Sequence, residues 1–139
     1  MLTRPGTLTP ELEALLARAM FPDPERLRRT LESYRLGTER QVYAWVVGGQ
    51  PVSAAGIRQQ GEPAGRDVEV LHLGTTPGQE GRGHARALLH AVAAHLNAAR
   101  LVAETDDSAV GFYRRAGFEV SSIPSRWDWV RYRCVLTPS

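Results

Sequence analysis

Residues 71–89 read LHLGTTPGQEGRGHARALL and form the most informative stretch of the chain. A strand-like run ends at Thr75, a glycine-rich loop follows, and Gly81-Arg82-Gly83-His84-Ala85 opens a predicted helix. The first N–H groups of a helix have no partner within it, and the helix dipole adds about half a positive charge there. Glycines at this entrance let a phosphate approach the backbone. The stretch therefore predicts a site for an anion with paired phosphates, and the alternative is a glycine-rich connection that binds nothing.

Two other nucleotide-binding motifs fit this stretch poorly. A dinucleotide-binding fingerprint requires Gly-x-Gly-x-x-Gly directly after the first strand of a parallel unit. A P-loop requires Gly-Lys-Ser/Thr, and all seventeen basic residues of the chain are arginine. The glycine-rich loop therefore indicates a different kind of phosphate site.

Two helices are predicted upstream of this stretch. Thr9-Pro10 and Asp23-Pro24 each combine an N-cap residue with proline at the first helical position, and Gly37 is suited to end the second helix. Apolar residues recur at helical spacing in both segments. The first eight residues are expected to be loose or to form one weak strand.

The hydrophobic period changes after the second helix, where segments rich in Val, Ile, Ala and aromatic residues alternate with turns. They predict, in order, strands Gln41–Val47, Val52–Gln59 and Asp67–Thr75, a helix of about Gly83–Ala98, a strand Leu101–Glu104, a helix Asp106–Ala116, and strands Phe118–Ile123 and Trp129–Leu136. Strands on either side of a crossover helix run parallel, whereas strands joined by a tight turn such as Gly48-Gly49 run antiparallel. The predicted fold class is α/β (α+β): a single mixed, mostly antiparallel sheet with helices on both faces, in one domain covering residues 1–139.

Composition argues against several classes of function. The chain has 139 residues, of which 42% are hydrophobic, and a formal net charge of +2, as in an ordinary globular domain. No stretch approaches the roughly 20 apolar residues of a membrane span, and the N-terminus lacks the layout of a signal peptide. The single Cys134 cannot form an intrachain disulfide. We therefore expect a cytoplasmic protein that binds no membrane.

Neither a nucleic acid nor a metal ion is expected as a partner. The arginines are scattered among acidic residues, whereas nucleic-acid-binding proteins usually cluster them on one face. The four histidines, at positions 72, 84, 90 and 95, lack the spacing of a metal site.

Residues Glu80–Ala85 and a second run from Asp106 to Phe118 carry two motifs that resemble, in the same order along the chain, those of the GCN5-related N-acetyltransferase (GNAT) family. The family's coenzyme A loop reads Gln/Arg-x-x-Gly-x-Gly/Ala, and here Glu80–Ala85 reads EGRGHA, with Pro77 upstream. The second motif has Asn, then Ala three residues on, then an apolar residue with Tyr, and it ends in Gly-Phe. Its counterparts here are Asp106, Ala109, Phe112-Tyr113 and Gly117-Phe118. The resemblance covers roughly residues 41–136.

The resemblance implies the acyl-CoA N-acyltransferase fold and acetyl-CoA as the cosubstrate. The acceptor would be a primary amine of a small molecule or peptide, which attacks the thioester directly in a ternary complex. The strand before the loop would hold the pantetheine arm through its backbone, and Gly74 suits a bulge that frees those backbone groups. The implied cofactor-binding residues are Leu73, Gly74, Thr75, Gln79, Gly81, Arg82, Gly83, His84, Ala85, Asp106 and Phe112.

The resemblance also implies two catalytic residues. Tyr113 lies at the position of the family's general-acid tyrosine, and its phenol can donate a proton to a developing thiolate. Glu69 lies where the histone-acetylating branch of the family carries its base. His72 is a second candidate for the base because imidazole titrates near neutral pH, and a water chain is a third. Alternation along the strand puts Glu69 and His72 on opposite faces, so both serve one site only if a bulge intervenes.

Two positions depart from the family pattern, because Glu80 replaces Gln or Arg and Asp106 replaces Asn. A carboxylate accepts hydrogen bonds but does not donate them, so Asp106 is better suited to be the N-cap of the next helix than to contact the cofactor directly. These departures motivate an alternative to the active enzyme, a non-catalytic module of the same fold that binds or senses acyl-CoA.

Aromatic residues near the C-terminus leave two further arrangements open. Trp127, Trp129 and Tyr132 would support a purely structural or interaction domain, or they would line the interface of a homodimer.

Several arginines lie in the segments that shape the acceptor site in this fold, and they would favour an acceptor with a carboxylate. They are Arg35, Arg40, Arg126 and Arg131. Exposed arginines are common on protein surfaces, so the sequence alone does not identify the acceptor.

Overall fold

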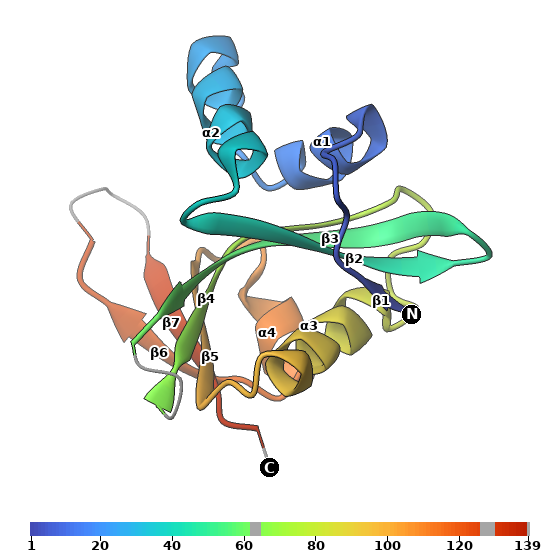
Figure 1. Ribbon diagram of the computed structural model, residues 1–139. Helices are drawn as coiled ribbons and strands as arrows, with labels where there is room; N and C mark the ends of the chain where they lie inside the picture. The colour runs from blue at the N-terminus through green and yellow to red at the C-terminus, as the bar shows by residue number, and fades with distance from the viewer. Residues whose placement is uncertain (62–64, 126–129, 139) are drawn as a thin grey trace.

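One sheet of seven strands runs through the described part of the protein, residues 1–61, 65–125 and 130–138 of a computed structural model (Figure 1). Its strands are β1 (Leu2–Thr3), β2 (Arg40–Val47), β3 (Gln50–Gln60), β4 (Asp67–Thr75), β5 (Arg100–Thr105), β6 (Glu119–Ile123) and β7 (Arg131–Leu136). The strand order is β1-β2-β3-β4-β5-β7-β6. Neighbours β4 and β5 run parallel, and each other neighbouring pair runs antiparallel. The predicted mixed, mostly antiparallel sheet is confirmed.

Helices cover both faces of this sheet, as predicted. They are α1 (Pro10–Ala17), α2 (Pro24–Leu36), α3 (His84–His95) and α4 (Val110–Arg115). Figure 1 shows α1 and α2 on one face and α3 and α4 on the other. Buried residues of α3, α4 and the central strands form the larger core, whereas α1 and α2 form a second core with Ala44 and Ala54.

The predicted starts of the first two helices, the end of the second and the glycine hairpin turn are all present in the structure. The Thr9 hydroxyl accepts a hydrogen bond from the N–H of Leu12 at 3.3 Å and begins α1. The Asp23 carboxylate accepts one from the N–H of Glu25 at 3.2 Å and begins α2, which ends at Gly37 with φ 66°. Gly48-Gly49, with φ of 60° and 79°, forms the hairpin turn between β2 and β3 because glycine adopts left-handed conformations without strain.

Several predicted boundaries were displaced. The weak N-terminal strand is the two-residue β1, paired with β2. Helix α4 begins at Val110 rather than at Asp106, and a separate turn precedes it, in which the Asp106 carboxylate accepts the N–H of Ser108 at 3.0 Å. The N-cap of α4 is therefore Ala109, and the capping role predicted for Asp106 was wrong. Of the predicted last strand, Trp129 lies outside the described residues, as do Arg126 and Trp127.

A bulge in β4 lies three residues before the predicted one. The register with β3 pairs Gly56 with His72 and Ile57 with Val70, so Leu71 is the extra residue. Gly74 pairs regularly with Ala54, and the expectation of a bulge there was wrong. Gly74 is required for another reason: a Cβ on it would lie 1.8 Å from the carbonyl oxygen of Leu15, because α1 crosses β4 at this point.

Candidate functional site

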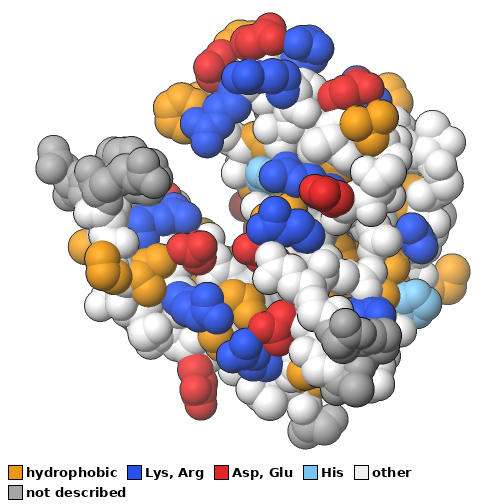
Figure 2. All heavy atoms as spheres, turned by 60° about the vertical axis from the view of Figure 1, so that its left-hand side comes forward, with side chains coloured by type: hydrophobic (Ala, Val, Ile, Leu, Met, Phe, Trp, Pro, Cys, Tyr) orange, Lys and Arg blue, Asp and Glu red, His pale blue; other side chains and the backbone are white. Residues whose placement is uncertain are grey.

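Strands β4 and β5 separate at one end of the sheet and open a cleft. Their parallel pairing stops at Val70 and Ala103, although β4 continues to Thr75 and β5 to Thr105. Beyond Val70, no described strand pairs with the β5-facing edge of β4, so backbone N–H and C=O groups of residues 71–75 face the cleft. The cleft has a volume of about 780 Å³. Figure 2 shows it as a hollow with arginine side chains on both walls.

Most of the predicted site residues meet along this cleft. They come from the end of β4, from α3, and from the turn and helix that follow β5, and they are Leu73, Gly74, Thr75, Ala85, Asp106, Phe112 and Tyr113. The opposite wall includes residues 18–22, which follow α1. Segments that lie far apart in the sequence therefore share one cavity.

The glycine-rich loop borders a second cavity of about 360 Å³, which adjoins the cleft through shared residues such as Thr75 and Ala85. Gly81 and Gly83 have φ of 78° and 82°, and nothing lies within 4 Å of a Cβ placed on either. The first bond within α3 joins the N–H of Ala87 to the carbonyl of Gly83. The N–H groups at residues 84–86 therefore have no partner within the helix.

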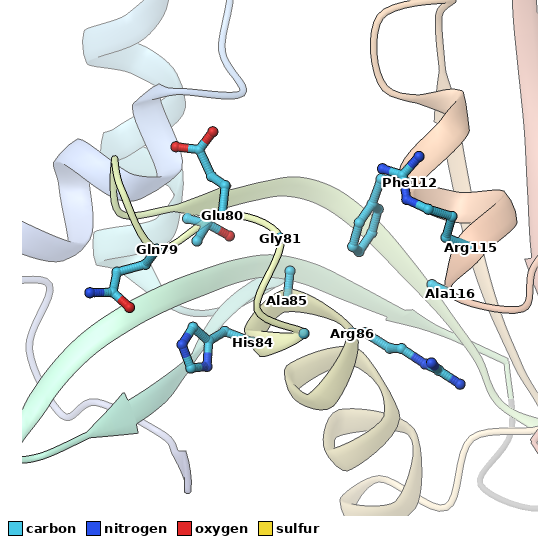
Figure 3. A pocket seen from close by; sticks show the side chains of 11 residues that line it. Gln79, Glu80, Gly81, His84, Ala85, Arg86, Phe112, Arg115 and Ala116 are labelled. Atoms are coloured by element: carbon cyan, nitrogen blue, oxygen red, sulfur yellow. The ribbon is translucent and has the colours of Figure 1, made fainter.

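Two arginines supply positive charge around this second cavity. Arg86 comes from α3 and Arg115 from α4 on the facing side (Figure 3). Neither forms an ion pair with a carboxylate among the described residues. Gln79 and His84 also line this cavity, whereas the side chain of Arg82 does not.

Glu80 lines the loop cavity and the cleft, but its charge is paired. Its carboxylate accepts a hydrogen bond from Arg18, at the end of α1, at 3.4 Å. In Figure 3 the Glu80 side chain points away from Ala85 and the start of α3. The repulsion that a carboxylate would exert on a phosphate is therefore reduced at the helix N-terminus.

Tyr113 lies between the larger core and the cleft. Its side chain is 7% exposed, and its ring makes edge contacts with Phe112 and Phe118, each with centroids 5.1 Å apart. Burial raises the pKa of the Tyr113 phenol above its usual value of about 10. The hydroxyl therefore stays protonated at neutral pH and can act as a proton donor.

The bulge at Leu71 brings the two candidate bases to one face of β4. Glu69 pairs across the sheet with Arg58, and His72 pairs with Gly56, two residues away on β3 and on the same face. The Glu69 carboxylate accepts a hydrogen bond from Arg58 at 2.5 Å and does not line the cleft. His72 lines the cleft. Alternation along the strand predicted opposite faces because it assumed regular pairing.

His72 is held by a residue that the sequence analysis did not single out. The Tyr34 hydroxyl, on α2, lies 2.6 Å from Nδ1 of His72, with the rings edge to face. Burial, together with the positive charge of Arg40, lowers the pKa of His72 to about 4. The imidazole is therefore neutral at physiological pH. Tyr34 appears in the sequence only as one more residue of an apolar helix stripe, which carries no sign of this contact.

Gly56 makes room for this arrangement. A Cβ on Gly56 would lie 2.1 Å from the Tyr34 hydroxyl oxygen, so any other residue there would displace the tyrosine. Gly56 and Tyr34 lie far apart in the sequence, so the need for glycine at this position becomes evident only from the tertiary structure.

Within residues 1–61, 65–125 and 130–138, no group of three His, Cys, Asp or Glu side chains could hold a metal ion. In the same part of the chain, no helix combines the length and apolar character needed to cross a membrane.

The chain is similar to known acetyltransferases in sequence pattern and in fold. Residues 9–118 match the model of the acetyltransferase (GNAT) family. No curated protein matches the chain. Among solved structures, an acetyltransferase of Bacillus subtilis in complex with CoA is 15% identical, with a TM-score of 0.71 over 98% of this chain and 97% of that one.

Two further structures have the same fold. An acetyltransferase of Elizabethkingia anophelis with acetyl-CoA bound is 16% identical, with a TM-score of 0.69 over 99% of this chain and 97% of that one. An aminoglycoside 6′-N-acetyltransferase complexed with coenzyme A is 15% identical, with a TM-score of 0.74 over 99% and 96%. The family model spans well over half of the chain, and the separated parallel strands lie within it. The chain therefore belongs to the GNAT acetyltransferase family.

Proposed function

We propose that this chain transfers the acetyl group of acetyl-CoA to a primary amine, by direct attack in a ternary complex. The observation that carries the proposal is the separation of β4 from β5 beside the start of α3. This separation brings together, in two adjoining cavities, an unpaired strand edge, a glycine-rich helix N-terminus and a buried tyrosine. Each of these features answers one chemical need of the reaction.

The residues present fit the two recognisable parts of acetyl-CoA. The unpaired edge at Leu73–Thr75 offers backbone donors and acceptors to an extended chain that contains amides, such as pantetheine. The free N–H groups at the start of α3, with Arg86 and Arg115 nearby, suit a pyrophosphate. Acetyl-CoA, when bound, supplies an acetyl group activated as a thioester. Arg82 would contact the pyrophosphate through its backbone, because its side chain does not line this cavity.

Bound ligand gives the first test of the proposal. Saturating acetyl-CoA, at about a hundred times its dissociation constant, should stabilise the protein by about 2.7 kcal/mol. For a domain of this size the unfolding temperature should rise by about 3–6 °C. An Ala85→Glu variant should lose this rise, because a carboxylate in the first turn of α3 repels a pyrophosphate while it favours the helix itself.

The matched control for this measurement is Ala94→Glu. Ala94 is exposed in the last turn of α3, far along the helix from its N-terminus. The control should keep the full rise with acetyl-CoA. If wild type shows no rise at millimolar ligand, or if both variants behave alike, the proposed coenzyme site is wrong.

Tyr113 is proposed as the general acid. The amine nitrogen forms a bond to the acetyl carbon as the carbon–sulfur bond breaks, and the departing thiolate needs a proton. Tyr113 lines the cleft, and its phenol, whose pKa burial raises further above the usual value, keeps its proton at neutral pH. A backbone N–H on the free edge of β4 can donate to the thioester carbonyl oxygen, where negative charge develops.

The amine must lose a proton, and Glu69 and His72 are the two side chains proposed to take it. Glu69 is held in an ion pair with Arg58 and does not line the cleft. His72 is neutral and lines the cleft. We therefore expect His72→Gln to lower kcat/KM about tenfold or more at neutral pH, and Glu69→Gln to lower it less.

Thiol release from acetyl-CoA measures both variants. Glu69→Gln also leaves Arg58 without its partner, so a double variant, Arg58→Gln with Glu69→Gln, separates that effect from loss of a base. A larger loss in both Glu69 variants than in His72→Gln would identify Glu69 as the base. Equal small losses in all of them would leave a water chain as the proton acceptor.

A further inference from the structure

A small cavity opens beside His72, on the side of the cleft that faces α2. Its volume is about 250 Å³, and it shares Met20, Phe21 and His72 with the cleft. Its remaining lining comes mainly from α2 and the start of β2 and includes two arginines, Arg26 and Arg40. No Asp or Glu lines this cavity in the described part of the chain.

The two arginines of this cavity differ from others close to it. Arg35 donates to Glu13 at 2.6 Å and to Glu32 at 3.1 Å, and Arg58 donates to Glu69. Arg26 and Arg40 form no ion pair with any described carboxylate. Two positive charges therefore line a cavity in which no described carboxylate neutralises them, which is the arrangement expected where a ligand supplies the anion.

Arg40 is held in position without being neutralised. Its guanidinium donates to the Ser33 hydroxyl at 3.3 Å and lies over the Tyr34 ring, 5.7 Å from the centroid. It is close enough to His72 to contribute to the low pKa of the imidazole. The cavity thus combines fixed positive charge with a neutral histidine at its junction with the cleft.

We infer that the acceptor is an amine that also carries a carboxylate, and that Arg40 and Arg26 bind this carboxylate. The inference rests on the proposed function and names its acceptor class. The carboxylate would lie in the small cavity, with any apolar portion of the acceptor against Met20, Phe21 and Leu27. The amine would then reach His72 and the cleft. A polycationic acceptor would be repelled by the same two arginines.

Matched pairs of acceptors test this inference directly. L-methionine is compared with L-methioninamide, and 5-aminopentanoate with 5-aminopentanamide, each at equal concentration of the unprotonated amine. The measurement is thiol release from acetyl-CoA. We expect kcat/KM to be higher by about tenfold or more for the carboxylate of at least one pair, because charged hydrogen bonds to two arginines are lost in the amide. Equal rates, or faster reaction of both amides, would overturn the inference.

Variants then assign the preference to the cavity. Arg40→Gln should raise KM for the carboxylate acceptor and reduce the preference over its amide to about twofold or less, and Arg40→Lys should restore part of it. Arg26→Gln should reduce the preference partially. The control is Arg29→Gln, which removes the same charge from an exposed position of α2 outside the cavity and should keep the preference. A preference that survives both Arg40→Gln and Arg26→Gln would show that the carboxylate binds elsewhere.

The rise in unfolding temperature with acetyl-CoA separates the inferred acceptor class from the proposed acetyltransferase function. If acetyl-CoA raises the unfolding temperature but none of the four acceptors releases thiol, the inferred acceptor class is wrong while the coenzyme site stands. If acetyl-CoA produces no rise, the proposed function fails first and the inference falls with it.

Discussion

Tyr113→Phe is expected to lower kcat at least about a hundredfold while the binding of acetyl-CoA is unchanged. General acid catalysis typically contributes a factor of about 10²–10⁴, and the Tyr113 phenol, which lines the cleft, is the proposed proton donor. The ring that contacts Phe112 and Phe118 stays in place, so the fold should be preserved. The rate of thiol release is measured with saturating amine, and the rise in unfolding temperature with acetyl-CoA reports binding.

Tyr132→Phe is the matched control for this prediction. Tyr132 is on β7, where its hydroxyl donates to Asp107 at 2.6 Å and its ring lies under Arg114, outside both cavities. Its loss should change the rate less than about twofold. Full activity of Tyr113→Phe would remove the tyrosine from the mechanism. A wild-type protein that binds acetyl-CoA but releases no thiol with any amine would instead support the non-catalytic alternative.

Gly74→Ala is expected to destabilise the protein by about 3 kcal/mol or more, the upper end of the usual cost of overpacking. The added methyl would lie 1.8 Å from the carbonyl oxygen of Leu15 and 2.8 Å from its carbon. These are backbone atoms, so the clash is not relieved by a rotamer change, and α1 must move away from β4. The free energy of unfolding is measured by denaturant titration.

Gly6→Ala provides the comparison, because nothing lies within 4 Å of a Cβ at Gly6 and the residue is exposed. Its effect should stay within about 0.5 kcal/mol. A Gly74→Ala protein as stable as Gly6→Ala would mean that α1 does not cross β4 as described. Because residues 18–22 after α1 form one wall of the cleft, Gly74→Ala should also weaken activity in whatever fraction remains folded.

Family and architecture were predictable because they depend on local spacing. The two motifs around Gly81 and Tyr113 identify the family from residues a few positions apart, and the family model confirms it. Caps such as Thr9 and Asp23 act on backbone N–H groups two or three residues away, so their chemistry is complete within one short segment. The roles proposed for the individual site residues stay predictions until the variants above are measured.

The bulge in β4 was predicted at the wrong residue, because a glycine within a strand can have more than one structural role. Gly74 suited a bulge, but its actual role is to admit the backbone of α1, fifty-nine positions away in the sequence at Leu15. The bulge formed at Leu71, a position with no sequence signal, because the register of β4 is set by its pairing with β3. This shift brought Glu69 and His72 to one face.

The sequence by itself therefore determined the order and type of the elements, the glycine-rich helix start and the family, all of which follow from residues that are near neighbours in the chain. Tertiary structure alone decided which charges are neutralised: Arg35 and Arg58 pair with carboxylates, whereas Arg40, beside His72, pairs with no carboxylate in the described part of the chain. It also decided the contact between Tyr34 and His72, thirty-eight residues apart. The physical reason is that ion pairs, burial and pKa depend on distances in space, and those distances exist only once helices have packed on the sheet.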